Sequence, residues 1–211
     1  MDVQGQATTF PSVASEDIAA SPEFRHLTTI AGIRVDLRYA SANNFVGRDL
    51  YSPFDCAWLH REAAEALEKV VAWLAREHPG YTALILDALR PQRVQEQLWT
   101  ALEGTGLQMY LANPVRGSIH SYGMALDITL LDEAGRELDM GTGFDDMTNL
   151  SHPALEEGFL VAGQLTEAQV ANRRLLRTAM LDAGFLGINT EWWHFDCGDR
   201  ELVRSTYRRV L

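Results

Sequence analysis

The stretch SIHSYGMALDITLL, residues 118–131, combines a regular apolar pattern with residues that could react. Apolar side chains alternate along its second half, so one face of an extended chain would carry Met124, Leu126, Ile128 and Leu130. The alternation predicts a strand over 123–131 with Asp127 on its polar face. His120 lies in the loop just before, so a hairpin-like bend would bring its imidazole to that carboxylate. Alone, such a pair is more often structural than catalytic.

A second segment, residues 190–196 (TEWWHFD), places Glu191 and His194 in an aromatic strand near the C-terminus. Charge buried in such surroundings is costly unless it has a partner. His120, Asp127 and His194 together offer two imidazole nitrogens and one carboxylate oxygen. Three such ligands, with a fourth position left for water, form a catalytic zinc site. Glu191 would then be the base beside that water, as in helical H-E-x-x-H sites.

Glu191 and His194 are three residues apart, which limits how both side chains could face one metal ion. Residues three apart on a regular strand point to opposite faces, so both could not reach one metal ion. The sequence therefore predicts a bulge or the end of a strand at Trp192-Trp193. A regular strand there, with Glu191 turned away, would contradict its assignment as the base.

The segments around these two motifs predict helices and further strands. Strands are expected at 30–37 and 82–87, and a long, glycine-punctuated loop at 139–163. Helices are expected at 60–77, 91–104, 166–184 and 200–210, the third opened by the capping box Thr166-Glu167-Ala168-Gln169. This order predicts an α+β fold, in which helices flank a central antiparallel or mixed sheet that carries the zinc site.

Length and composition indicate one globular domain. The chain has 211 residues, of which 46% are hydrophobic. Residues 1–22 are polar and lack an apolar period, which predicts a loosely ordered leader before a single catalytic domain at 23–211. With 18 Lys and Arg against 29 Asp and Glu, the formal charge is −11. Nucleic acid is therefore not an expected partner, and no apolar run is long enough for a membrane span.

The cysteines and the N-terminus bear on the compartment. Cys56 and Cys197 stand in no metal or redox motif, which favours two thiols and leaves a disulfide open. The N-terminus lacks the basic and apolar regions of a signal peptide. We expect a cytoplasmic protein, or a periplasmic one if a signal peptide has been removed. The sequence has no pattern that predicts an oligomeric state.

The order S-x-H-x-x-G-x-A-x-D, followed much later by E-x-W-H, resembles the zinc peptidases that cut D-alanyl peptides of the bacterial cell wall. Four further segments narrow the likeness to the D-alanyl-D-alanine dipeptidases of the VanX type. They are residues 36–40 (DLRYA), 43–47 (NNFVG), 87–91 (DALRP) and 139–145 (DMGTGFD), the last followed by Ser151-His152. The resemblance extends from about residue 28 to residue 197.

The resemblance implies a role for each matching residue. The zinc ligands fall on His120, Asp127 and His194, and the catalytic base on Glu191. The family's arginine beside the scissile bond falls on Arg90, where a guanidinium would stabilise the oxyanion. A structural ion pair between Arg90 and Asp87 is the alternative. The substrate-binding positions fall on Tyr39, Asp87, Ser118 and Asp145.

The two acidic positions concern the free amine of a dipeptide. Asp87 and Asp145 match acidic groups near that amine, and Asp146 is an alternative to Asp145. Leu89 is a departure, since an aromatic residue often precedes the arginine in the family. For His152, a role in supporting the site or fixing its loop stays open, because Ser-His recurs at this place in the resemblance.

The predicted function is hydrolysis of D-alanyl-D-alanine to two D-alanines by a metallo-dipeptidase with one Zn²⁺ per chain. The expected partner is this small peptidoglycan-derived dipeptide. One alternative is a D,D-carboxypeptidase or another peptidoglycan-peptide hydrolase on the same scaffold. A second is a zinc-containing binder of wall fragments without catalysis, although such a binder has no need of Glu191 and Arg90.

Overall fold

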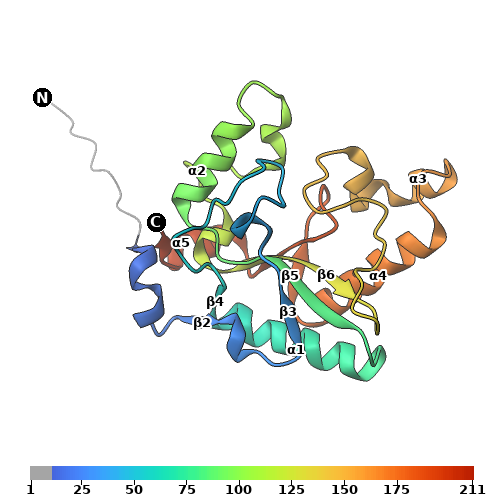
Figure 1. Ribbon diagram of the computed structural model, residues 1–211, viewed down its shortest axis with the longest axis horizontal. Coiled ribbons are helices and arrows are strands. Elements are labelled where there is room, and N and C mark those ends of the chain that lie inside the picture. Colours follow the sequence, from blue (N-terminus) through green and yellow to red (C-terminus); the bar gives the residue numbers. More distant parts are fainter. Residues whose placement is uncertain (1–10) are drawn as a thin grey trace, which may run out of the picture.

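The computed structural model describes residues 11–211, which are built around a five-stranded sheet (Figure 1). In spatial order the strands are β3 (Ile33–Val35), β5 (Thr82–Asp87), β6 (Ala125–Leu131), β8 (His194–Cys197) and β7 (Phe185–Gly187). Strand β3 runs parallel to β5, and every other neighbouring pair is antiparallel. The predicted α+β fold with a mixed sheet is confirmed.

The middle strand, β6, brings polar residues of three strands to one end of the sheet. Both faces of β6 are covered, so nearly all of its side chains are buried. Asp127 of β6 is the register partner of Asp87 on one side and of His194 on the other. The pairing with β5 shifts between Ile85 and Asp87, which marks an irregularity just before that end. The register alone therefore gathers the three residues.

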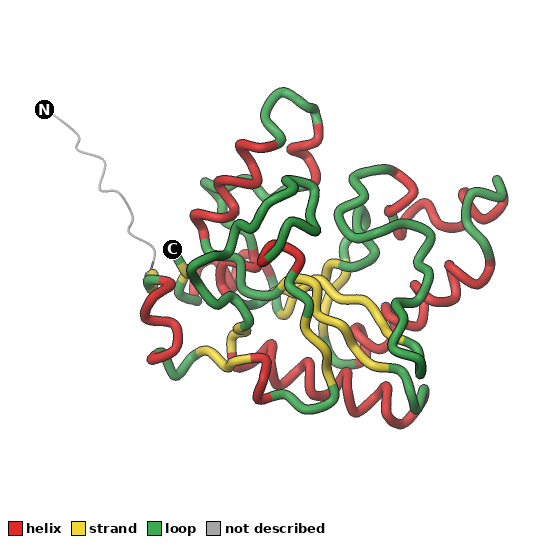
Figure 2. The backbone as a smooth tube through the Cα atoms, in the orientation of Figure 1, coloured by secondary structure: helices red, strands yellow, loops and turns green. Residues whose placement is uncertain are grey.

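Helices surround the sheet (Figure 2). Helix α1 (Arg61–Glu77) runs below the strands in the view of Figure 1, and α2 (Gln92–Ala101) rises above them. Helix α4 (Glu167–Asp182) packs against α1, and both bury apolar residues in the core cluster that contains the apolar residues of β6. The predicted capping box is present: the Thr166 hydroxyl accepts from Gln169 N–H, and the Gln169 side chain accepts from Thr166 N–H.

Short elements complete the chain. Strand β2 (Phe24–His26) pairs with β4 (Trp58–His60), and β1 (Ser12–Val13) pairs with β9 (Arg209–Val210). Two further helices are α3 (Glu156–Val161) and α5 (Arg200–Thr206). The 3₁₀ turns are η1 (Ser15–Ala20), η2 (Leu27–Thr29), η3 (Arg38–Ala40), η4 (Leu107–Tyr110), η5 (Ile119–Tyr122), η6 (Asn149–Ser151) and η7 (Pro153–Leu155).

The expected loose leader is wrong for the part of it that the structure describes. Its first ten residues lie outside the described residues, but β1 and η1 follow directly. Val13 and Ile18 are buried in a small cluster with Phe24, Leu89 and Val210. These two apolar residues are too few to give a period, yet they are enough to attach the segment to the domain.

Other boundaries also differ from the expectation. The segment 139–163 contains α3 and two 3₁₀ turns, and the strand expected over 190–196 begins only at His194. The last helix ends at Thr206, after which the chain extends into β9. Cys56 and Cys197 are both unpaired thiols. Within residues 11–211, no helix has both the length and the apolar character of a transmembrane span.

Candidate active site

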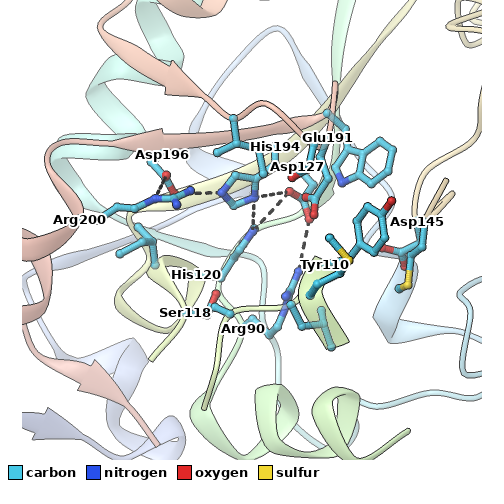
Figure 3. A pocket seen from close by; sticks show the side chains of 18 of the residues that line it. Arg90, Tyr110, Ser118, His120, Asp127, Asp145, Glu191, His194, Asp196 and Arg200 are labelled. Carbon is cyan, nitrogen blue, oxygen red and sulfur yellow. Dashed lines mark hydrogen bonds and ion pairs between the residues drawn. The ribbon is translucent and has the colours of Figure 1, made fainter. Parts of the chain in front are cut away.

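A cavity of about 210 Å³ opens at the end of the sheet where β6 and β8 carry their polar residues (Figure 3). We call it the central cavity. Pockets for drug-sized ligands occupy about 300–1,000 Å³, so this space suits a smaller molecule. Its walls include most of the residues singled out from the sequence: Tyr39, Arg90, Ser118, His120, Asp127, Asp145, Glu191 and His194.

His120, Asp127 and His194 converge in this cavity as the sequence predicts. His120 comes from η5, while Asp127 and His194 are neighbours across β6 and β8. His194 Nδ1 lies 2.9 Å from Asp127 Oδ1 and 3.1 Å from His120 Nε2, and His120 Nε2 lies 3.4 Å from Asp127 Oδ1. Ligands about 2.0–2.1 Å from a tetrahedral zinc ion are separated by about 3.3 Å. The spacing therefore fits a metal ion.

The hydrogen bonds behind the two imidazoles fix which ring nitrogen faces the centre. His120 Nδ1 lies 2.8 Å from the Ala88 carbonyl oxygen, which can only accept, so Nδ1 carries the proton. His194 Nε2 lies 2.9 Å from Asp196 Oδ1, so when the ring holds a metal ion Nε2 keeps its proton and Nδ1 is the nitrogen left to bind the ion. Two lone pairs and one carboxylate oxygen then point at each other. Three converging atoms that can each share a lone pair, with no N–H or O–H group between them, form the ligand set of a metal site.

The charges around the cluster favour a cation at its centre. Burial lowers the pKa of His194, but the carboxylates of Asp196 and Asp127 outweigh burial and raise it to about 10. Burial raises the pKa of Asp127, yet His120 and His194 hold it well below its usual range. The surroundings thus stabilise positive charge beside an ionised Asp127, which a bound metal ion would supply.

A glycine fixes the turn that carries His120. Gly123 ends η5 with φ of +66°, a conformation that L side chains rarely adopt. A Cβ at this position would lie 2.7 Å from the backbone nitrogen of His60, which itself donates to the Gly123 carbonyl at 2.8 Å. Glycine is required here because β4 approaches the turn so closely.

The predicted irregularity before His194 is confirmed. Trp192 and Trp193 form a bend, and β8 begins at the next residue. Trp192 Nε1 donates to Thr142 Oγ1 at 2.8 Å, and the Trp193 carbonyl accepts from Ile128 N–H at 3.0 Å, so both sides of the bend are anchored. Because Glu191 lies before the strand rather than on it, its side chain reaches the same cavity as His194 (Figure 3).

Glu191 lies in surroundings that suit a proton carrier near neutral pH. Burial raises the pKa of its carboxyl group to about 7, with Asp127 adding to the rise and His194 and Arg90 opposing it. A general base works best when its pKa is near the working pH. In Figure 3 its carboxyl group lies beside Asp127.

Arg90 combines the two readings that the sequence left open. Its Nε and Nη2 donate to Asp87 Oδ2 at 2.8 and 2.6 Å, so the ion pair is present. Nη2 also lies 3.3 Å from Asp127 Oδ2, and Nη1 donates to Gln95 Oε1 at 3.1 Å. Arg90 is buried but lines the central cavity, which leaves it placed to act on a bound molecule.

The structure does not bring Asp87 to the substrate side, contrary to the expectation of a contact with the amine. Asp87 is completely buried and does not line the central cavity. Its carboxylate accepts from Arg90, from the Tyr51 hydroxyl and from Ala88 N–H. The irregularity in β5 turns this side chain behind Arg90, where it holds the guanidinium instead.

Tyr39 and Asp145 do meet in the cavity. The Tyr39 hydroxyl lies 3.0 and 2.9 Å from the two Asp145 oxygens, and the Arg90 guanidinium lies 5.0 Å from the Tyr39 ring centre. Burial raises the pKa of Asp145 well above its usual value, and Asp127 and Glu191 add to the rise, while Tyr39 and Arg90 oppose it. Asp146 does not line the central cavity, which favours Asp145 of the two.

Three further residues complete the site. Ser118 lines the cavity at the start of η5, as expected. His152 does not touch the metal-site residues: its Nε2 lies 3.0 Å from the hydroxyl of Tyr110, which lines the cavity, so it joins two loops. The sequence reading missed Asp196, which holds His194. The signal was available, because residues two apart on a strand share a face.

The chain is similar to known peptidases. Residues 22–210 match the model of the peptidase M15 family, described as D-Ala-D-Ala dipeptidase. A D-alanyl-D-alanine dipeptidase of Escherichia coli K12 is 40% identical over 164 residues, covering 78% of either chain. One from Enterococcus faecium is 31% identical over 199 residues, covering 84% of this chain and 92% of the relative. One from Enterococcus faecalis V583 is 30% identical over 195 residues, covering 83% and 91%.

A solved structure of the LdcB LD-carboxypeptidase is also similar. It aligns with a TM-score of 0.48 at 15% identity, covering 87% of this chain and 71% of that one.

Proposed function

The chain belongs to the peptidase M15 family of D-Ala-D-Ala dipeptidases, and on that premise we propose that it hydrolyses D-alanyl-D-alanine to two D-alanines with one zinc ion. The observation that carries the proposal is the buried convergence of two imidazole lone pairs and the Asp127 carboxylate, with Glu191 beside them. The small volume of the central cavity suits a dipeptide. A donor set of two nitrogens and one oxygen is common at catalytic zinc sites.

His120, Asp127 and His194 would hold the metal ion. A bound divalent cation polarises the scissile carbonyl and lowers the pKa of a bound water. The chain's part is to fix the three donors. The Ala88 carbonyl orients His120, and Asp196 orients His194, so neither ring has to turn when the ion binds.

Glu191 would move the protons. Its carboxylate takes a proton from the attacking water as the water oxygen forms a bond with the carbonyl carbon. The same carboxyl group then returns the proton to the amide nitrogen as the C–N bond breaks. A pKa of about 7 supports both steps, because neither form is strongly favoured near neutral pH.

Arg90 would stabilise the negative charge that develops on the carbonyl oxygen. Its guanidinium faces the cavity and is held from behind by Asp87 and Gln95. A donor fixed before the reaction needs no reorganisation when charge develops, which is why such groups contribute strongly to catalysis.

Asp145 and Tyr39 would bind the free amine of the dipeptide, and Ser118 would contact the substrate. The crowding of Asp145 with Asp127 and Glu191 supports this assignment, since a bound ammonium would relieve their repulsion. A requirement for a free amine distinguishes a dipeptidase from a carboxypeptidase. The two unpaired cysteines support a reducing compartment such as the cytoplasm.

The test is hydrolysis of dipeptides that differ in chirality and in the amine. We expect D-Ala-D-Ala to be cleaved, L-Ala-L-Ala and N-acetyl-D-Ala-D-Ala to be cleaved poorly, and a chelator to abolish activity until zinc is restored. A protein that trims pentapeptide precursors but ignores D-Ala-D-Ala would instead be a carboxypeptidase. Binding of wall fragments without any turnover would indicate a non-catalytic binder.

A further inference from the structure

The central cavity has a cationic end that the proposed mechanism does not use. Helix α5 follows the strand of His194, and two of its arginines, Arg200 and Arg204, line the cavity. Residues four apart lie on the same side of a helix. Figure 3 shows Arg200 on the opposite side of the His120–Asp127–His194 cluster from Asp145. The cavity therefore extends from a carboxylate at one end to two guanidinium groups at the other.

Each arginine is anchored by part of its guanidinium and keeps the rest available. Arg204 Nε donates to the carbonyl of Gly117, the residue before Ser118, at 3.2 Å, and its Nη1 donates to Glu201 at 2.9 Å. Arg200 Nε donates to Asp196 at 2.5 Å. Among residues 11–211, Nη2 of Arg204 and both Nη atoms of Arg200 make no hydrogen bond. These terminal N–H groups remain free to bind an acceptor from the cavity.

The charges at this end of the cavity do not cancel. Glu201 is shared between Arg204 and Arg116, whose Nη2 lies 2.5 Å from it, and Asp196 is shared between Arg200 and His194. Three arginines thus face two carboxylates in a chain whose formal charge is −11. Burial lowers the pKa of Arg204, and repulsion from Arg116 and Arg200 lowers it further. A bound anion would relieve this repulsion.

We propose that Arg204 and Arg200 bind the C-terminal carboxylate of the substrate, next to Ser118. The inference rests on the proposed function and deepens it. Arginine forms short, charge-assisted hydrogen bonds to carboxylates through two neighbouring N–H groups. With its amine bound at Asp145 and its carboxylate bound at α5, a dipeptide would be held at both charged ends, and its peptide bond would lie beside His120, Asp127 and His194. Substrates whose second residue is extended or amidated lose this contact.

The first test measures binding without turnover. In a Glu191→Gln background, calorimetry compares the affinities of D-Ala-D-Ala and D-Ala-D-Ala amide. We expect the free acid to bind about 10- to 100-fold more tightly, as charge-assisted hydrogen bonds allow. Adding Arg204→Gln should remove most of that difference. Equal affinity for acid and amide in the Glu191→Gln protein would overturn the inference, whether or not the wild-type protein is a peptidase.

The second test uses steady-state kinetics. Arg204→Gln should raise KM for D-Ala-D-Ala about tenfold or more, with kcat changed little and KM for the amide unchanged. Arg116→Gln is the matched control, because Arg116 shares Glu201 but does not line the cavity. An equal rise in KM for acid and amide would overturn the inference as a merely structural effect. If the wild-type protein cleaves neither compound, the proposed function is wrong. The calorimetric comparison of acid and amide still shows whether Arg204 binds the carboxylate.

Discussion

Each histidine of the candidate metal site has one ring nitrogen hydrogen-bonded to a fixed acceptor. The acceptor of His120 is a backbone carbonyl, whereas that of His194 is the side chain of Asp196, which Arg200 holds in turn. A backbone carbonyl keeps its place under substitution, but Asp196 can be replaced. The orientation of His194 is therefore open to a direct experiment.

Replacing Asp196 with Asn should weaken metal binding without removing a ligand. The amide can no longer hold the protonated Nε2 of His194 as a carboxylate does, and loss of such partners costs about 10- to 100-fold in metal affinity. Competition with a chelator of known affinity measures the change. Asp182→Asn, at an exposed position, is the control. Unchanged affinity in Asp196→Asn would show that His194 is oriented by other contacts.

Removing the carboxylate of Glu191 should strongly reduce turnover while leaving metal binding intact. The Glu191→Gln protein should lose about 10²- to 10⁴-fold in kcat, the usual contribution of a general acid–base group. Its metal content, measured by elemental analysis, should equal that of wild type. Glu157→Gln, on the exposed side of α3, should behave as wild type. Activity within a few-fold of wild type in Glu191→Gln would remove Glu191 from the mechanism.

The same carboxyl group sets the acid side of the pH profile. Glu191 must be ionised to accept a proton, so kcat/KM should rise with pH through the pKa of Glu191 and fall below it. Burial places that pKa at about 7, and a bound cation stabilises the carboxylate, so the limb should lie at about pH 7 or lower. The residual activity of Glu191→Gln should lack this limb. A limb that persists there would belong to another group.

The residues of the site were predictable where chemistry alone selects them. His120, Asp127, Glu191 and His194 could be identified because they are polar residues in apolar segments. Burying such groups is costly unless they are paired or bind a metal ion. The role of Asp87 was not predictable, since it depends on which way the irregular end of β5 turns its side chain. No sequence pattern states that direction.

At the scale of elements, helix α4 offers a change remote from the cavity. Thr166→Ala removes the hydroxyl that accepts from Gln169 N–H and should cost about 1 kcal/mol, a typical capping contribution. In a chain of this size the melting temperature should fall by about 2–4 °C. Turnover of D-Ala-D-Ala should not change. A change in kcat without a change in melting temperature would contradict the purely structural role.

Long elements were predictable, and short ones were not. Helix α1 and strands β5 and β6 display several apolar periods, so their extents follow from the sequence. Strand β7 has three residues and α3 has six, too few to display a period. Strand β8 starts late because Trp192 and Trp193 form a bend. The strand propensity of residues 190–196 did not predict this bend. It was predicted because Glu191 and His194 could not otherwise face the same cavity.

At the scale of the whole molecule, residues 11–21 are part of the domain. They bury apolar side chains against Phe24, Leu89 and Val210, and their strand pairs with the last strand of the chain. The sequence predicted the α+β class because the alternation of helices and strands is written along the chain. It did not predict this attachment, because contacts between distant segments leave no local period.

Shortening Ile18 should therefore destabilise the whole domain. Ile18→Ala removes a buried side chain and should cost about 2–5 kcal/mol, lowering the melting temperature by several degrees. Val161→Ala, at a position that is 85% exposed, should change little. A melting temperature equal to wild type for Ile18→Ala would mean that residues 11–21 are not held in solution.

Residues 11–21 also contact the loop that carries Arg90, so their effect is not limited to stability. Leu89, against which they pack, immediately precedes Arg90, and Arg93 one turn further on donates to the Ser15 hydroxyl at 2.5 Å. Residues 13–18 thus pack behind the loop that carries Arg90. Cleavage of the backbone between Ile18 and Phe24 would change no group in the cavity, yet it would weaken the packing behind Arg90, so we expect it to lower turnover more than metal binding.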